Sequence, residues 1–500
     1  MAGRAAPGSV PELRAALAET GAIGSTLRQL AGRLSQPLPR VRHDLHALRA
    51  AGDVLEMGRG LWILRDFERL ERREDFVDPA EYVERFLRDG GVALGTYRGP
   101  ITFSSNERLA VHRWWPYVQG YSAEFVRGLL DRSGLGRGGT VLDPFAGSGT
   151  TLVEARRAGQ RALGVEILPP AALAARVKTR FELDGSSLAA SAEGVLARAR
   201  TRPTGDLPFL RETPRQFAPR VLADLTRLRD ALPPEGRPSD EALRLAFGKI
   251  LIPVSRLRRS PCLGYGGPDR PERDVFHEFD SAVARMREDL RALQAERPDW
   301  GPPARVYTGD ARRLRLPPAS VDLAVTSPPY VNGMDYVTNY KLDLAWLGYA
   351  SSYPDLVAFR RAMIACDNLP RGDSDAFLSP ARLPDPWLEE ILGRIRRNVE
   401  QKGTYRRNDV HGIVLRYFLD LLAVLRRTFR ALRPGGGFVL VVGDSLLAGT
   451  YVPGDLLTAR LGARVGFEIG SVEVARERRS GQRRSFRLRE SIVTLRRPRG

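Results

Sequence analysis

The spacing of apolar positions changes along the chain and divides it into segments of different predicted structure. In residues 1–70, three stretches have apolar residues three or four positions apart, and two short apolar runs flank a Gly-Arg-Gly turn. The wider spacing is typical of amphipathic helices, whereas apolar runs about such a turn indicate a hairpin. We therefore predict three helices and a β-wing, which is the layout of a winged helix-turn-helix.

Short apolar runs alternate with helical spacing from about residue 101 onward. Residues 140–168 read as strand, Gly-rich turn, helix and strand, and residues 304–330 contain two further strands. An amphipathic helix at 412–433 leads into another buried strand, and the C-terminal residues predict an antiparallel pair. Strands that alternate with helices predict an α/β sheet with helices on both faces.

Two long stretches interrupt this alternation and are predicted to be insertions. Residues 180–303 are Arg-rich and helical in pattern, whereas residues 345–411 have an irregular pattern. Both follow core strands, on the side where an α/β sheet forms its binding crevice. The predicted organisation is a winged-helix domain at 1–70, a helical linker at 71–100, and a main domain at 101–500 that contains both insertions.

The sequence DPFAGSGTT at residues 143–151 joins a predicted strand to a helix. Gly147 and Gly149 permit a tight turn and a close approach of the backbone to a ligand, and the helix start offers unpaired N–H groups. A nicotinamide-binding Gly-x-Gly-x-x-Gly is excluded because residue 152 is Leu, and a phosphate-binding loop is excluded because no Gly-Lys-Ser/Thr follows.

These nine residues together resemble the S-adenosylmethionine-binding motif of amino-group DNA methyltransferases. The resemblance implies a Rossmann-like class I methyltransferase sheet, in which the loop wraps the amino-acid part of the cofactor. The loop residues it assigns to the cofactor are Asp143, Pro144, Phe145, Ala146, Gly147, Ser148, Gly149 and Thr150. Glu166 ends the next strand, where a carboxylate can accept both ribose hydroxyls, and Asp310 ends the third, where an acceptor can hold the adenine amino group.

The second motif is TSPPY, which ends the apolar run VDLAVT. An exocyclic amino group is a poor nucleophile because its lone pair is delocalised into the base. Ser327 Oγ and the Pro328 carbonyl are expected to accept hydrogen bonds from this amino group, and Pro328 and Pro329 would fix both acceptors before the base arrives. Tyr330 is expected to supply a face on which an extruded base stacks.

The resemblance extends to residues 112–130, 327–348 and 432–445, and covers about 110–180 and 304–500 of the chain. In this family, Ser at the first position of the motif is commoner in cytosine-N4 enzymes and Asp in adenine-N6 enzymes, so we favour cytosine N4. The alternatives are an adenine-N6 DNA methyltransferase, an RNA base methyltransferase, and a DNA-binding regulator with an inactive methyltransferase fold. A cognate restriction or defence protein is an expected partner.

The net charge of +19, from 78 Lys and Arg against 59 Asp and Glu, favours double-stranded DNA as the partner, although Arg-rich usage also arises in GC-rich genomes. In the winged helix, DNA contacts are predicted for Arg40, Arg42 and Arg59, against the alternative of a protein-docking module. In residues 345–411, Arg406 and Arg407 lie near Trp387 and Tyr405, and basic residues mixed with aromatics suit phosphate contact and base stacking. This stretch is the first candidate for target recognition, and residues 256–274 are the alternative.

The remaining features predict a protein of a reducing cytoplasm with no membrane partner. No apolar stretch approaches the length of a membrane span, and the N-terminus lacks a signal-peptide pattern. Two cysteines, Cys262 and Cys366, cannot build a disulfide framework, and Cys262 with His277 is too small a set for a metal site. We therefore predict no metal.

Overall fold

The computed structural model describes most of the chain. The described residues are 9–20, 25–57, 61–64, 79–117, 120–259, 262–266, 272–296, 299–366, 369–370, 385–402, 407–479 and 487–499.

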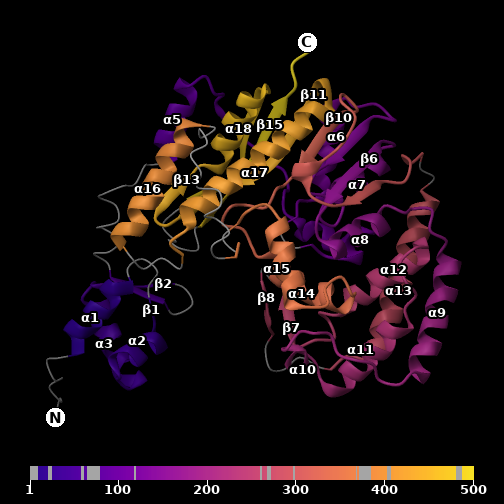
Figure 1. The fold of residues 1–500 in the computed structure, drawn as a ribbon, viewed down its shortest axis with the longest axis horizontal. Coiled ribbons are helices and arrows are strands. Elements are labelled where there is room, and N and C mark those ends of the chain that lie inside the picture. Colours follow the sequence, from indigo (N-terminus) through magenta and orange to yellow (C-terminus); the bar gives the residue numbers. More distant parts are fainter. Residues whose placement is uncertain are drawn as a thin grey trace.

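The N-terminal residues form three helices and a small antiparallel sheet, at the lower left of Figure 1. The elements are α1 (Ser9–Thr20), β1 (Ser25–Thr26), α2 (Leu27–Leu34), α3 (Leu38–Ala50), β2 (Val54–Met57) and β3 (Leu61–Leu64), with strand order β1-β3-β2. Thr26 caps α2 through a capping box with Gln29. Leu17, Val41 and Trp62 bury their side chains between the helices and the sheet.

The main body is organised around an eight-stranded sheet with the order β4-β14-β15-β11-β10-β5-β6-β9. Its strands are β4 (Leu94–Thr96), β5 (Thr140–Asp143), β6 (Arg161–Glu166), β9 (Arg305–Thr308), β10 (Val321–Thr326), β11 (Leu432–Gly443), β14 (Glu468–Arg479) and β15 (Arg487–Arg496). Strands β11, β10, β5, β6 and β9 are parallel, whereas β15 is antiparallel to both of its neighbours.

Helices cover both faces of this sheet because successive strand residues point to opposite sides. Leu323 and Val325 of β10 pack in one layer with α6 (Ala123–Ser133) and α7 (Thr150–Arg157). Ala324, between them, packs in the other layer with α17 (Val410–Ala431) and α18 (Gly454–Val465). The continuous apolar run of β10 is thus explained by burial on both faces.

The stretch predicted as an insertion at 180–303 forms a helical layer beyond one end of the sheet, at the lower right of Figure 1. Its elements are α9 (Gly185–Thr201), α10 (Thr213–Gln216), α11 (Pro219–Ala231), α12 (Pro238–Ile250), β7 (Leu257–Arg259), β8 (Leu263–Tyr265) and α13 (Val275–Ala295). The apolar faces of these helices form one core with α8 (Pro169–Lys178) and α14 (Tyr336–Trp346). The remaining short helices near it are η2 (Phe103–Arg108) and η3 (His112–Trp114).

Two expectations about the main body need correction. Residues 79–96 are not a linker, because β4 pairs with β14 and α5 (Pro79–Arg88) buries Tyr82 and Phe86 in the core of the main body. The stretch 345–411 is also not simply irregular: it contains α15 (Tyr353–Ala362) and α16 (Pro386–Lys402). The short strands β12 (Ser445–Leu447) and β13 (Thr450–Val452) and the 3-10 turn η4 (Ala311–Arg313) complete the described elements.

Candidate functional site

The order of the strands places both sequence motifs at one crevice. From β5 the chain runs outward to β6 and β9, then returns to place β10 on the other side of β5. In an open α/β sheet, ligands bind at such a switch point, beyond the carboxyl ends of the strands. DPFAGSGTT begins with the last residue of β5, and TSPPY begins with the last residue of β10. The fold therefore brings the two motifs side by side.

Asp143 forms hydrogen bonds with residues of both motifs. Its carboxylate accepts hydrogen bonds from Tyr121 Oη (2.7 Å), Thr151 Oγ1 (2.7 Å), Thr326 Oγ1 (2.6 Å) and the Phe145 N–H (3.0 Å). The residue is buried, and burial raises the pKa of the Asp143 carboxyl although these hydrogen bonds oppose the shift. Asp143 does not line the pocket itself. Its hydrogen bonds therefore hold the Gly-rich loop and the end of β10 in position.

The Gly-rich loop is held in shape by backbone geometry and by Glu166. Gly149 has a φ of 86°, and a Cβ at this position would lie 2.9 Å from Ala175 Cα, so a larger residue would be strained and would collide with α8. Glu166 accepts the Gly147 N–H at Oε2 and the Leu168 N–H at Oε1, both at 2.8 Å. Burial raises the pKa of Glu166 to about 7, in spite of these two bonds.

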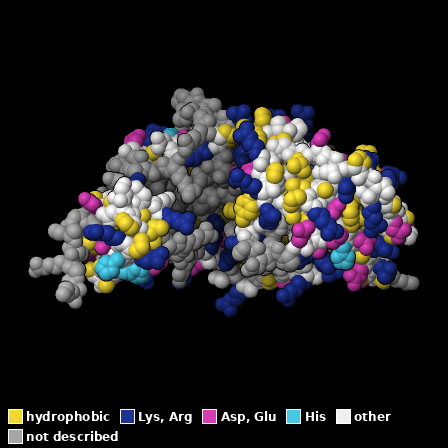
Figure 2. Space-filling view, turned by 90° about the horizontal axis from the view of Figure 1, so that it is seen from below, with side chains coloured by type: hydrophobic (Ala, Val, Ile, Leu, Met, Phe, Trp, Pro, Cys, Tyr) yellow, Lys and Arg dark blue, Asp and Glu magenta, His cyan; other side chains and the backbone are white. Residues whose placement is uncertain are grey.

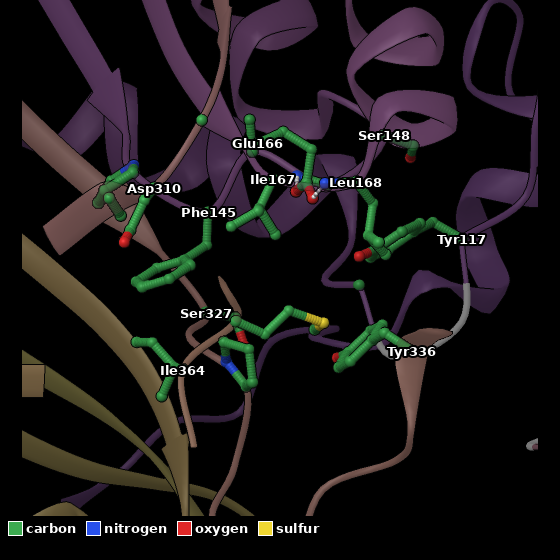
Figure 3. A pocket seen from close by; sticks show the side chains of 18 of the residues that line it. Tyr117, Phe145, Ser148, Glu166, Ile167, Leu168, Asp310, Ser327, Tyr336 and Ile364 are labelled. Carbon is green, nitrogen blue, oxygen red and sulfur yellow. Dashed lines mark hydrogen bonds between the residues drawn. The ribbon is translucent and has the colours of Figure 1, made fainter. Parts of the chain in front are cut away.

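A pocket lies between the loop and the end of β10 (Figure 3). Figure 3 shows Glu166 at one end and Ser327 at the other, with Phe145 and Ile364 facing Tyr117 and Tyr336 across the space. Most predicted residues line this pocket, namely Pro144, Phe145, Ala146, Gly147, Ser148, Thr150, Glu166, Asp310, Ser327 and Pro329. Asp143, Gly149, Pro328 and Tyr330 do not line it.

Sequence reasoning missed several apolar and aromatic walls of this pocket. Ile167 and Leu168 directly follow Glu166 in the chain, and this position could have indicated that they also line the pocket. Tyr117 belongs to the aromatic segment before the first motif, and its ring stacks on Tyr336 (6.0 Å between centroids) and Tyr340 (5.5 Å). Nothing in the local sequence indicates that α14 would supply the partners of this stack.

Asp310 lines the pocket, but Arg312 engages its carboxylate. Arg312 donates from Nε to both carboxylate oxygens (2.9 and 3.0 Å) and from Nη2 to Oδ2 (2.8 Å). The same guanidinium reaches Asp420 on α17 at 2.9 Å. A ligand that contacts Asp310 would therefore share this carboxylate with Arg312.

A second and larger cavity, of about 820 Å³, adjoins the first. Ser327 and Tyr117 line both cavities, so the serine stands where they meet. Tyr330 lines only the second cavity, where its Oη donates to Glu490 Oε1 (2.6 Å) and its ring lies 5.2 Å from the Arg478 guanidinium. Pro328 is buried and Pro329 is half-buried, which fixes the backbone between the serine and the tyrosine.

The residues predicted to contact DNA have different surroundings. Arg40 and Arg42 are exposed on α3, whereas Arg59 and Arg406 lie outside the described residues. Arg407 is 9% exposed and donates to the Asp409 carboxylate (2.6 and 2.8 Å), an arrangement that suits a structural role. Trp387 is buried in the core and is not available for base stacking, which corrects that expectation.

The described residues contain no helix long and apolar enough to span a membrane. They also contain no group of three or more His, Cys, Asp or Glu side chains suited to a metal ion.

Residues 118–175 match a family model described as DNA methylase. The Type II methyltransferase M.BsoBI of Geobacillus stearothermophilus is 23% identical over 481 residues, which are 86% of this chain and 92% of that protein. The Type II methyltransferase M.AvaI of Nostoc sp. (strain PCC 7120) is 24% identical over 405 residues, 75% of this chain and 82% of that protein.

Among solved structures, the rRNA methyltransferase aviRa from Streptomyces viridochromogenes is 13% identical to this chain. The match covers 79% of this chain and 92% of that one, with a TM-score of 0.28. The α/β Rossmann-like arrangement of this chain is seen in its strand order and in the helical layers on both faces of the sheet.

Proposed function

We propose that this chain, a member of the amino-group DNA methyltransferases that use S-adenosylmethionine, methylates the N4 amino group of a cytosine that is flipped out of double-stranded DNA. The single observation that carries the proposal is the position of Ser327 at the junction of two cavities. One cavity has the features expected of a cofactor site, and the other is large enough and cationic enough for a nucleotide. A transfer reaction needs both substrates to meet at such a junction.

The residues of the first cavity fit the cofactor by their donors and acceptors. The first turn of α7 has no side-chain cap, so its N–H groups are available to the carboxylate of the amino-acid part. Each oxygen of Glu166 accepts one N–H from the loop and retains a lone pair for a ribose hydroxyl. Phe145 and Ile364 would pack on the adenine ring. We propose that the Asp310 carboxylate accepts a hydrogen bond from the adenine amino group while it remains bound to Arg312.

Ser327, Pro328 and Pro329 are the proposed catalytic residues. When bound, the cofactor supplies a methyl group on a positively charged sulfonium. The Ser327 Oγ and the Pro328 carbonyl would accept the two N–H groups of the base, which favours a nitrogen whose lone pair points out of the ring plane. Both acceptors also stabilise the positive charge that develops on this nitrogen. Because the prolines fix the backbone, the acceptors need no rearrangement when the base enters.

Tyr330 is the proposed wall against which the base rests. Its hydroxyl is bound to Glu490 on β15, so the ring has a fixed orientation at the second cavity. Arg478 already lies against this ring, at 5.2 Å from its centroid. We therefore propose that the base enters beside Tyr330 and also contacts Arg478, because a guanidinium can stack on a base.

Methylation of defined DNA tests the proposal directly. The purified chain is incubated with radiolabelled S-adenosylmethionine and with plasmid DNA or RNA, and the digested nucleosides are separated. We expect the label in N4-methylcytosine from DNA. Label in N6-methyladenine would overturn the choice of base, label only in RNA would overturn DNA as the substrate, and DNA binding without any transfer would favour a regulator.

Methylation mapping would also identify the target site. Because the relatives are Type II methyltransferases, we propose that a restriction enzyme is paired with this chain, and the mapped site would show whether it fits such an enzyme.

The affinity for the adenosine part of the cofactor is expected to depend on pH through Glu166. Above pH 7 this carboxyl is ionised and can accept both ribose hydroxyls, whereas below its pKa of about 7 protonation removes acceptor capacity. With 5′-methylthioadenosine, we expect a constant Kd above pH 7.5 and a Kd roughly tenfold higher at pH 6, by titration calorimetry. This ligand has the adenine and ribose but lacks the titrating amino-acid part.

The control for this experiment is Glu166→Gln, which cannot ionise. The variant should bind methylthioadenosine about tenfold more weakly, with the same Kd at every pH. A wild-type Kd that is constant from pH 5.5 to 8.5 would contradict the assignment of Glu166 to the ribose.

For the N-terminal unit, we propose a winged helix-turn-helix in which α3 contacts DNA through Arg40 and Arg42. Both side chains are exposed, while Val41 and Leu45 of the same helix are buried. We expect Arg40→Ala with Arg42→Ala to weaken DNA binding about tenfold at 100 mM salt, without a change in kcat. The exposed Arg28 on α2 gives the control, Arg28→Ala. If the double variant binds DNA as tightly as the control, a protein-docking role would be favoured.

A further inference from the structure

The second cavity has a strongly cationic lining that comes from two distant parts of the chain. The basic residues in its wall are Lys249 on α12, Arg258 and Arg259 on β7, and Arg476 and Arg478 on β14. The carboxylates in its wall are Glu107 and Glu490. Such an excess of positive charge around a cavity attracts a polyanion. Figure 2 shows Lys and Arg side chains gathered near the middle of the face seen from below.

Three of these cations already have partners inside the protein. Arg259 is paired with Asp343 and lies 4.3 Å from the centroid of the Tyr340 ring. Arg476 is paired with Glu490, and Arg478 donates to the Asp444 carbonyl at 3.0 Å. Arg259 and Arg476 are therefore engaged in ion pairs, and Arg478 is held by a backbone carbonyl and by the Tyr330 ring.

Lys249 and Arg258 differ, because the side chain of neither residue forms a hydrogen bond or an ion pair with any residue that the structure describes. Arg258 is exposed and Lys249 is partly buried. Burial, with smaller contributions from Arg285 on α13 and Arg259, lowers the pKa of Lys249 to about 8, and Glu107 on η2 partly opposes this shift. Lys178 on α8 is a further basic group near Lys249, and burial lowers the pKa of Lys178 well below its ordinary value. Glu107 acts on Lys249 only through space, and a partly buried ammonium without an ion-pair partner is costly unless an anion binds to it.

We propose that Lys249 and Arg258 of the helical insertion bind the phosphates of the target strand on either side of the flipped nucleotide. This inference rests on the proposed function, since it needs a base at Ser327. The phosphates next to a flipped base must pass the mouth of the cavity that receives it, and the cavity at Ser327 is the one that these two cations line. The helical insertion therefore forms the wall that grips the target strand.

The competing candidate from the sequence, residues 345–411, has a different arrangement. Helix α16 buries Leu388, Ile391 and Ile395 in the core of the main body. Among its basic residues, Arg394 is paired with Glu390. Arg396 and Arg397 are exposed on α16, but they do not line the cavity that contains Ser327. They supply a control of matched charge.

The first test compares two double variants of the full-length protein, Lys249→Ala/Arg258→Ala and Arg396→Ala/Arg397→Ala. The probe is a fluorescent duplex that contains the site methylated by the wild type, and its Kd is measured between 50 and 300 mM salt. We expect the first variant to bind at least tenfold more weakly at 100 mM salt, with a salt slope reduced by about 1.8, whereas the second binds within threefold of the wild type. Both should bind S-adenosylhomocysteine as the wild type does.

The opposite pattern, a loss only in the α16 variant, would overturn the inference and return target binding to residues 345–411. Equal Kd values and salt slopes in both variants would overturn it as well. A wild type that neither binds nor methylates DNA is a separate result, because it would overturn the proposed function itself.

The second test uses the lysine's titration. As pH rises from 7 to 9, Lys249 loses its proton, so wild-type affinity for the duplex should fall about tenfold over this range. Lys249→Arg should keep its affinity over this range, because a guanidinium stays charged. A wild-type Kd with the same dependence on pH as that of Lys249→Arg would show that Lys249 does not bind phosphate.

Discussion

Replacing Ser327 with alanine is expected to lower kcat for methyl transfer about 100-fold, with no change in the affinity for S-adenosylhomocysteine. The serine stands where the two cavities meet, and its Oγ is the acceptor proposed to orient the amino group of the base. Alanine removes this acceptor and leaves the cofactor loop untouched. The loss should therefore appear in single-turnover rates with saturating DNA and cofactor, which report the chemical step.

Ser320→Ala is the matched control for this variant. Ser320 precedes the same strand at its other end and donates to the Pro317 carbonyl at 2.7 Å, so the substitution is chemically identical but far from the crevice. Its single-turnover rate should stay within twofold of the wild type. A Ser327→Ala protein with the same rate as this control would remove the serine from the mechanism and leave the Pro328 carbonyl as the acceptor.

Asp143→Asn is expected to reduce both stability and catalysis. The carboxylate accepts four hydrogen bonds, and an amide of the same shape presents two N–H groups among these donors. Leaving buried groups unpaired should lower the free energy of unfolding by about 2 kcal/mol, measured by urea denaturation. The rate should fall at least tenfold at a temperature where the variant is folded, because Thr326 precedes Ser327.

Two further variants separate stability from positioning. Thr326→Val removes only the bond between β10 and Asp143, so it should lower kcat with little effect on cofactor affinity. Asp184→Asn changes an exposed aspartate that caps α9, where asparagine caps equally well, and should have no effect. A Thr326→Val protein with unchanged kcat would show that Asp143 stabilises the fold without positioning the second motif.

The local parts of the site could be predicted from the sequence. The turn at Gly147 and Gly149 depends on residues that are contiguous in the chain, and Glu166 is fixed by the strand that follows the same helix. The position of these segments beside Ser327 also follows from the alternation of strands and helices, because parallel strands bring their carboxyl ends to one edge. For this reason, the pocket contains most of the residues expected there.

The remaining parts depend on contacts between distant segments, which leave no local pattern. Arg312 joins Asp310 to Asp420, and nothing near either aspartate indicates this pairing. Trp387 lies among basic residues in the sequence, as a DNA-binding aromatic would, yet Arg85 and Arg460 cover its ring in the core. The basic residues at the mouth of the second cavity come from α12, β7 and β14, so no single stretch of sequence contains the cluster.

The pairing of β4 with β14 has a consequence for the order of synthesis. Leu94 pairs with Val472, so β4 leaves the ribosome long before its partner is made, and at roughly 5–20 residues per second this interval lasts tens of seconds. The strand β15, which separates β14 from β11, is made after both of them. The β11 side of the nascent sheet therefore stays open until β15 emerges. A β4 of only three residues exposes few unpaired backbone groups in the meantime, which limits its capacity to recruit another chain.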